Sequence, residues 1–170
     1  MPTIKEWKFE LFPSDNTFTE RIDFSIDDHN FLMVFTPFKN SFNEEYFLWL
    51  SENIGFDIPD DGYVIKFDRV ENFETGDFFA RPSDDFSKFD LKKLNRLGKA
   101  IKEIIEFHCS LKNTEIYYAS AQDFKMKKYY DRLIKKYSKY LNFEILSNLG
   151  EERLDYVIKT RNYKDQSQKD

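Results

Sequence analysis

The chain has 170 residues, of which 41% are hydrophobic and 18% aromatic, and its formal net charge is −5. This length and composition exclude a globally disordered protein and leave room for one domain with a substantial core rather than two. We expect a single domain over residues 1–161. The last residues, "KDQSQKD", carry no core-forming side chains, so residues 162–170 should form a mobile C-terminal tail.

Membrane insertion and secretion have no support in the sequence. No segment approaches the ~18 uninterrupted apolar residues of a membrane-spanning helix, and the first residues, "MPTIKEWKFELF", lack the apolar run of a secretory signal. The single Cys109 cannot form a disulfide within the chain, which fits a reducing compartment. We therefore expect a cytoplasmic protein. Its wealth of Lys, Asn, Ile, Phe and Tyr indicates an AT-rich gene, as in phages and mobile elements.

Charge is distributed unevenly along the chain. Residues 1–90 contain 20 Asp or Glu and 8 Lys or Arg, a net charge of −12, whereas residues 91–170 contain 11 and 18, a net charge of +7. One interpretation is that the acidic and basic halves simply face each other in the fold. The alternatives are an acidic face for a basic partner or a basic face for phosphate groups.

Strand patterns dominate the first ninety residues. Apolar residues alternate with polar ones on both sides of the "PSDN" turn at residues 13–16, which predicts a β-hairpin. "FLMVFT" is continuously apolar and is followed by Pro37, as expected for a central strand buried on both faces. "GYVIKFDRV" and the shorter "GDFFARP" predict two further strands.

A short helix is expected after the central strand. Ser41 and Glu44 fit a capping box at its start, and Gly55 stands where a helix end favours a residue of positive φ. The residues predicted to face inward are Phe47, Leu48 and Leu50.

Two long helices and three strands are predicted in the second half. Asp90 and Asp123 are good N-caps for the helices, each followed by apolar residues at intervals of three and four. "EIYYASA" predicts the strand between them, and "FEILSNLGEERLDYVIKT" predicts a closing antiparallel hairpin. The expected class is α/β (α+β), with a mixed, mostly antiparallel sheet of about seven strands, two long helices and one short helix.

Residues 89–161 resemble the C-terminal half of the GNAT superfamily of acyl-CoA N-acyltransferases. The shared features are the order strand, helix, strand, helix, strand, strand, with "YYASAQD" and "YYDRLIKKYSKYLNFEIL". In that family the helix after the fifth strand carries a tyrosine, and a Leu-Gly-Phe step leads into the next strand. Here Asn142 replaces the glycine and Phe143 matches the phenylalanine, while Tyr137 and Tyr130 are the nearest tyrosines.

The resemblance implies acetyl-CoA as cofactor, with Tyr137 or Tyr130 protonating the leaving thiolate as a general acid. The family holds the pyrophosphate on a Q/R-x-x-G-x-G/A loop at a helix start, and the nearest stretch is "NRLGKA", which would place Arg96, Gly98 and Lys99 near the cofactor. The periodicity, however, puts Gly98 inside a helix whose N–H groups are already bonded. An interior glycine is either tolerated or lets another element approach closely.

The second long helix carries seven Lys or Arg against one Asp. Six of them fall opposite the apolar stripe and form a candidate binding surface, which a solvated face would also explain. Nucleic-acid binding would use this surface with Tyr129 or Tyr140 as stacking groups, and the remaining candidates are a protein partner or the phosphates of a small ligand. The six are Lys125, Lys128, Arg132, Lys135, Lys136 and Lys139.

Other motifs carry little chemistry. His29, in "DDHN", is expected in a solvated turn, and His108 with Cys109 is expected to pack in the core because helix neighbours point about 100° apart. There is no Walker loop, H-E-x-x-H or G-x-S-x-G, so nucleotide hydrolysis, zinc proteolysis and serine hydrolysis have no support. No metal site is expected.

Three functions remain as hypotheses. The first is a small cytoplasmic protein of phage or mobile-element type that needs no cofactor and acts on a protein partner as an inhibitor, immunity or accessory protein. The second is an active, acetyl-CoA-dependent N-acyltransferase. The third is a nucleic-acid-binding protein, which the net charge of −5 disfavours.

Overall fold

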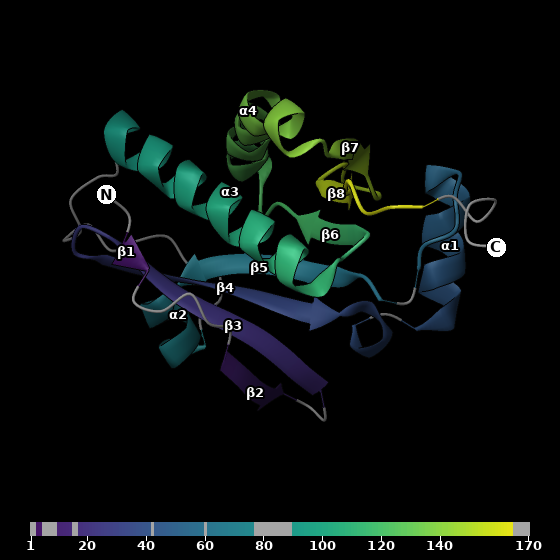
Figure 1. Ribbon diagram of the computed structural model, residues 1–170, viewed down its shortest axis with the longest axis horizontal. Helices are drawn as coiled ribbons and strands as arrows, with labels where there is room; N and C mark the ends of the chain where they lie inside the picture. Colours follow the sequence, from purple (N-terminus) through teal and green to yellow (C-terminus); the bar gives the residue numbers. More distant parts are fainter. Residues whose placement is uncertain are drawn as a thin grey trace.

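The structure, a computed structural model, describes residues 3–4, 10–14, 17–41, 43–59, 61–76 and 90–164. In these ranges it has helices on both faces of a single mixed sheet (Figure 1), which confirms the predicted α/β class. The sheet has eight strands, where the sequence predicted about seven. The strands are β1 Thr3–Ile4, β2 Glu10–Ser14, β3 Thr17–Ile26, β4 His29–Pro37, β5 Tyr63–Arg69, β6 Ile116–Ser120, β7 Glu144–Leu149 and β8 Asp155–Lys159.

The strand order is β1-β3-β4-β5-β6-β8-β7, with β2 paired to β3 beside β1. All described pairs are antiparallel except β5 and β6, which lie parallel and pair over only two positions, Tyr63 with Tyr117 and Val64 with Tyr118. The hairpins predicted at "PSDN" and at the end of the chain are confirmed as β2–β3 and β7–β8. The predicted central strand is β4, which ends at Pro37 and is buried along most of its length.

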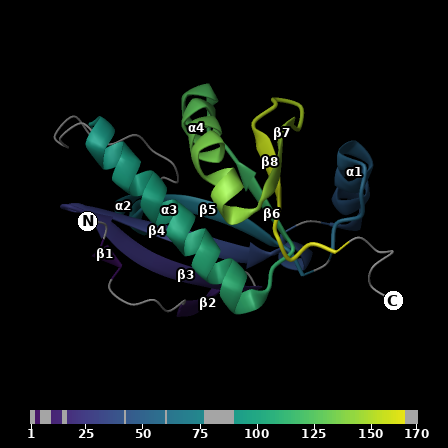
Figure 2. The same ribbon diagram turned by 45° about the horizontal axis from the view of Figure 1, so that its top comes forward.

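Four α-helices and one turn of 3-10 helix accompany the sheet in the described part of the chain. The long helices α3 and α4 pack on one face, and α1 packs on the other near the far end of the sheet, as Figures 1 and 2 show. The helices are η1 Phe38–Asn40, α1 Glu44–Ile54, α2 Val70–Thr75, α3 Leu91–Lys112 and α4 Phe124–Leu141.

The two sides of the sheet are buried by alternate residues of the same strands, as a period of two requires. On β6, Tyr117 points toward α3 while Ile116 and Tyr118 point toward α1. On β8, Tyr156 packs near α4 and Val157 packs near α1. The helices therefore enclose two apolar layers, one on each face.

Both long helices begin where the sequence predicts. The carboxylate of Asp90 accepts from the N–H of Lys93, and that of Asp123 accepts from the N–H of Met126, each at 2.8 Å. Such caps satisfy N–H groups that have no partner within the helix. Gly55 ends α1 with a φ of 82°, also as predicted.

The start of α1 differs from the prediction of a capping box at Ser41. The Ser41 hydroxyl instead donates to the carbonyl of Pro37 at 3.1 Å, within the 3-10 turn that follows β4. The cap is Asn43, whose side chain accepts from the N–H of Tyr46 at 2.8 Å. In α1, Leu48 lies on the outer side, 66% exposed, while Leu50, about 200° further round the helix, is buried. The prediction that Leu48 faces inward is wrong.

One helix was missed by the sequence analysis, and two further predictions concern a strand and the C-terminal tail. Helix α2 was not predicted. The predicted strand "GDFFARP", apart from its first residue Gly76, and residues 165–170 of the predicted tail lie outside the described residues. Residues 162–164, which the sequence assigns to the tail, do make contacts: the ring of Tyr163 lies 5.3 Å from that of Phe56, and the N–H of Lys164 donates to Glu115 at 3.0 Å.

Candidate functional site

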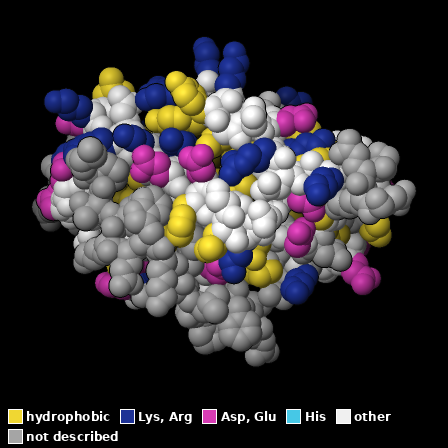
Figure 3. Space-filling model, in the orientation of Figure 1, with side chains coloured by type: hydrophobic (Ala, Val, Ile, Leu, Met, Phe, Trp, Pro, Cys, Tyr) yellow, Lys and Arg dark blue, Asp and Glu magenta, His cyan; other side chains and the backbone are white. Residues whose placement is uncertain are grey.

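The outer side of α4 carries the candidate binding surface that the sequence predicts. With 3.6 residues per turn, its six Lys and Arg residues fall within about 100° of helix arc, opposite the apolar stripe. All six are exposed, and Figure 3 shows Lys and Arg side chains gathered above α4. We call this surface the basic α4 face; it comprises Lys125, Lys128, Arg132, Lys135, Lys136 and Lys139.

None of these six side chains forms an ion pair with another described residue. Lys127, the seventh cation of α4, behaves differently: its ammonium lies 2.8 Å from the carboxylate of Asp131 and 5.7 Å from the ring centre of Tyr156. The single acidic residue of α4 therefore neutralises a cation outside the basic α4 face. That face keeps its full positive charge in a protein that is acidic overall.

The two tyrosines predicted as stacking groups beside this surface differ in their exposure to solvent. Tyr140 is 87% exposed and can contact a partner. Tyr129 is half-buried, and its hydroxyl donates to the carbonyl of Leu94 on α3 at 2.8 Å, so it joins the two long helices. The prediction of an exposed Tyr129 is wrong because the side chain lies on the α3 side of the helix. Phe124, 65% exposed, is a further aromatic group at the start of α4.

A cavity of about 120 Å³ lies between α3, α4 and the sheet. Its wall is almost wholly apolar, and both candidate catalytic residues, Tyr130 and Tyr137, line it together with Gly98 of α3. Lys102 and Ser138 also line it. The strands contribute Met33, Ile65, Phe67, Ala119, Ile145, Tyr156 and Ile158.

The two cavity tyrosines have different surroundings. Tyr130 lies among aromatic rings, with centroids at 6.2 Å to Phe67 and 6.0 Å to Tyr156, and burial raises its pKa, with Tyr129 and Asp68 adding to the effect. Tyr137 lies between two ammonium groups, Lys102 at 5.7 Å and Lys136 at 5.3 Å from its ring centre. A phenol in the setting of Tyr130 stays protonated, but its raised pKa makes it a weaker proton donor than a general acid whose pKa lies near the working pH.

The predicted cofactor-binding residues are engaged within the protein. The guanidinium of Arg96 donates two hydrogen bonds, of 2.9 and 2.7 Å, to the carboxylate of Asp27 in the β3–β4 turn. The exposed Lys99 lies 4.0 Å from Glu103, one turn along α3. Gly98 is buried inside α3 against α4, beyond the first turn whose N–H groups lack a partner within the helix, so its N–H is not a free donor. The structure thus brings the tyrosines and Gly98 to one cavity but leaves Arg96 and Lys99 outside its lining.

A buried polar cluster on the sheet side of α3 was not predicted as a unit. The ring of His108 stacks on Phe35 with centroids 4.0 Å apart, its Nδ1 lies 2.7 Å from the Tyr117 hydroxyl, and its Nε2 lies 3.4 Å from Glu20. Lys112 approaches the other Glu20 oxygen at 3.5 Å. The prediction that His108 and Cys109 pack in the core is confirmed, since both are fully buried.

Opposing influences set the charges in this cluster. Burial alone would raise the pKa of Glu20, but hydrogen bonds from His108 and Lys112 and the positive charge of Lys112 outweigh it and lower the pKa. Burial lowers the pKa of His108 despite the nearby carboxylate. Because an ionised Glu20 can only accept, the neutral ring donates from Nε2 and Nδ1 accepts from the Tyr117 hydroxyl.

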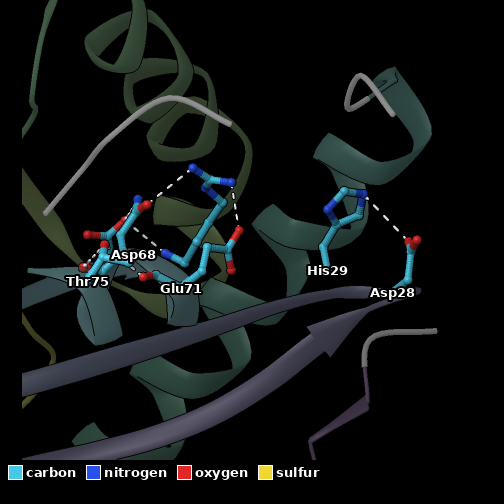
Figure 4. Close-up of polar contacts among 7 residues, drawn as sticks. Asp28, His29, Asp68, Glu71 and Thr75 are labelled. Atoms are coloured by element: carbon cyan, nitrogen blue, oxygen red, sulfur yellow. Dashed lines mark hydrogen bonds and ion pairs between the residues drawn. The ribbon is translucent and has the colours of Figure 1, made fainter. Parts of the chain in front are cut away.

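A second polar cluster ties α2 to the end of β5 (Figure 4). Arg69 donates to Glu71 at 2.7 Å and to Asn72 at 3.2 Å, and Asn72 donates to Asp68 at 2.7 Å. These contacts hold the first turn of α2, so they account for its position. In the same view His29 lies 3.7 Å from the Asp28 carboxylate; it is buried at the start of β4, so the predicted solvated turn is wrong.

Within the described ranges, no group of three or more His, Cys, Asp or Glu residues is arranged to hold a metal ion. The helices described there include none that is long and apolar enough to cross a membrane.

Comparison of the chain with protein-family models, with curated proteins and with solved structures finds no match.

Proposed function

We propose that this chain is a small binding protein on a GNAT-like scaffold and that its basic α4 face binds an acidic protein partner. A cytoplasmic protein of phage or mobile-element type, serving as an inhibitor, immunity or accessory protein, fits this role. The observation that carries the proposal is the set of six exposed cations without an ion-pair partner in the described part of the chain. Clustered charge of one sign steers and selects partners of the opposite sign.

The scaffold part of the proposal is supported by the arrangement of the second half of the chain. After β5 and the short α2, the elements run α3, β6, α4, β7, β8; apart from α2, this is the order on which the resemblance rests. Strands β5 and β6 share only two paired positions, and the cavity lies beside them under α3 and α4. An opening between strands of this sheet is where the GNAT family places its cofactor.

A charge-reversal experiment tests the binding proposal. Lys128→Glu, Arg132→Glu and Lys135→Glu, combined, reverse half of the basic α4 face. Binding of a poly-glutamate peptide, measured by fluorescence anisotropy, should weaken about tenfold, because three exposed ion pairs contribute about 0.2–1 kcal/mol each. A matched control, Lys39→Glu with Lys66→Glu and Lys164→Glu, changes the net charge equally at other exposed sites.

The control should bind the peptide nearly as well as the wild type. Equal loss in both variants would mean that net charge alone drives the interaction, and no binding by the wild type would remove the proposal. A DNA duplex serves as the competing ligand. If it binds more tightly than the peptide, with an affinity that falls steeply with salt, the partner is a nucleic acid instead.

An acetyl-CoA-dependent N-acyltransferase is the second candidate, favoured by the cavity that Tyr130 and Tyr137 line. The engagement of Arg96 and Gly98 within the fold speaks against it. Isothermal titration with acetyl-CoA decides between the two. Absence of heat and of a thermal shift at millimolar ligand rules the enzyme out, whereas binding that Tyr130→Phe leaves intact while abolishing acyl transfer would establish it.

A further inference from the structure

Helix α1 presents a surface whose chemistry is the opposite of that on α4. Its outer side has two rows at four-residue spacing, Glu44–Leu48–Glu52 and Glu45–Trp49. All five side chains are exposed, and none of the three glutamates forms an ion pair with another described residue. We call these five residues the acidic α1 face.

The apolar centre of this face is unusual for a solvated helix. Leu48 is 66% and Trp49 38% exposed, and both lie among carboxylates. Exposed apolar groups rimmed by charge mark interaction surfaces, and tryptophan is among the residues that dominate binding energy. Trp49 is also held in place, since its ring lies 5.5 Å from that of Tyr46, whose hydroxyl shares a 2.9 Å hydrogen bond with Tyr118 of the sheet.

The acidic α1 face and the basic α4 face are complementary in charge and in apolar content. The acidic α1 face has three carboxylates and the basic α4 face has six cations, so the two faces attract each other. Leu48 and Trp49 can cover the methylene stems of the α4 lysines and the exposed ring of Tyr140. Helix α4 has 18 residues and α1 has 11, so α1 can lie along α4 over its whole length.

The two faces cannot meet within one chain. In both Figure 1 and Figure 2 the β7–β8 hairpin lies between α4 and α1, which stands at the far end of the sheet. A contact between the faces therefore joins two molecules. Because every copy carries both faces, the contact either closes reciprocally in a two-fold dimer or repeats head to tail.

We propose that the acidic α1 face of one copy binds the basic α4 face of a second copy of this chain. This inference rests on the proposed function, because it identifies one acidic protein partner of the basic α4 face. Attraction between opposite charges sets the pairing, and burial of Leu48 and Trp49 at the centre supplies the apolar contact.

Sedimentation velocity on the full chain tests this self-association. The mean mass should rise with protein concentration at low ionic strength and fall toward that of the monomer as salt is added. Leu48→Ser leaves the charge unchanged and should weaken association at least about tenfold. A wild type that stays monomeric, or a Leu48→Ser variant that associates like the wild type, overturns the inference.

A charge swap makes the test specific to these two faces. Variant X carries Glu44→Lys, Glu45→Lys and Glu52→Lys. Variant Y reverses all six positions of the basic α4 face, with Lys125→Glu, Lys128→Glu, Arg132→Glu, Lys135→Glu, Lys136→Glu and Lys139→Glu. Each variant alone should be monomeric, because like charges then face each other. A mixture of X and Y should associate again, since every contact between the two variants pairs opposite charges. Failure of the mixture to associate overturns the inference.

The Leu48→Ser variant also separates this inference from the proposed function. Leu48→Ser keeps both the basic α4 face and the net charge, so it should bind the poly-glutamate peptide as the wild type does. Peptide binding by a chain that never self-associates would sustain the proposed function and remove the second copy as partner. Absence of peptide binding would remove the proposed function itself.

Discussion

Gly98 on α3 lies directly against Leu133 on α4: a Cβ atom added at Gly98 would overlap Cδ2 of Leu133 and lie 3.3 Å from the Tyr129 hydroxyl. The glycine therefore lets the two long helices approach each other. Of the two roles open to an interior glycine, close packing is the one observed. The contact also positions α4, and with it the basic α4 face, on the sheet.

Substituting Gly98 with valine should destabilise the fold by about 1–3 kcal/mol, because the added methyl groups overpack the α3–α4 contact. Alanine should cost less, since its single methyl can be accommodated if Leu133 turns toward the neighbouring cavity, which it lines. Urea unfolding measures both. Lys99→Val is the matched control, an exposed change in the same helix turn that should cost no more than about 0.7 kcal/mol. Equal losses at positions 98 and 99 would contradict the packing role.

The His108 cluster should make stability depend on pH. In the unfolded chain His108 has its ordinary pKa of 6.5, whereas burial lowers the pKa in the fold. The unfolded state therefore binds more protons as pH falls through 6.5, and the free energy of unfolding should decrease there. The pKa of Glu20 is also lowered, so its contribution is lost only below its ordinary value of 4.5.

Urea unfolding at a series of pH values from about 5 to 8 measures this slope. In His108→Gln the slope near pH 6.5 should flatten, although the variant is less stable at every pH. The charged and titratable groups that face His108 are Glu20 from β3, Lys112 from α3, Tyr63 from β5 and Tyr117 from β6. Burial, with the Glu20 carboxylate, raises the pKa of Tyr63 to about 12, so its phenol stays protonated in this window. An unchanged slope in His108→Gln would assign the dependence to other groups.

Removal of the Tyr117 hydroxyl tests the hydrogen bond to His108. Tyr117→Phe leaves the Nδ1 acceptor of a fully buried ring without its 2.7 Å donor, so the free energy of unfolding should fall by about 1–3 kcal/mol. Tyr140→Phe deletes the same group at a position that is 87% exposed and should change stability by less than about 0.5 kcal/mol. Thermal or urea unfolding of the two variants compares them. A Tyr117→Phe variant as stable as Tyr140→Phe would mean that the hydrogen bond adds nothing net.

Local signals account for what the sequence predicts well. The caps Asp90 and Asp123, the helix end at Gly55 and the two hairpins depend on residues within a few positions of one another, so pattern alone places them. The position of the basic α4 face follows likewise from spacing within a single helix. Helix α2 has only six residues and is held by the contacts of Arg69, which no periodicity reveals.

The buried polar cluster and the cavity, which the sequence did not predict, depend on contacts between segments far apart in the chain. Glu20 and His108 are separated by 88 positions, and only the fold brings them together. A signal was nevertheless present in the sequence: Glu20 keeps the period of two that places Ile22 and Phe24 in the core, and a carboxylate at such a position needs a buried partner. The cavity has no sequence signature, because the residues that line it come from both long helices and from strands far apart in the sequence.

The last prediction concerns the orientation of α1. Leu48 and Leu50 lie on opposite sides of this helix. Leu50 is 1% exposed and packs with Val64 and Tyr118, so Leu50→Ala should cost about 2–5 kcal/mol in the free energy of unfolding. Leu48, 66% exposed, should tolerate alanine within about 0.5 kcal/mol in dilute solution. Urea unfolding of the two single variants makes the comparison. A large loss at Leu48 would restore the helix phase that the sequence predicted and remove the acidic α1 face, whereas a loss confined to Leu50 leaves Leu48 available for contact between molecules.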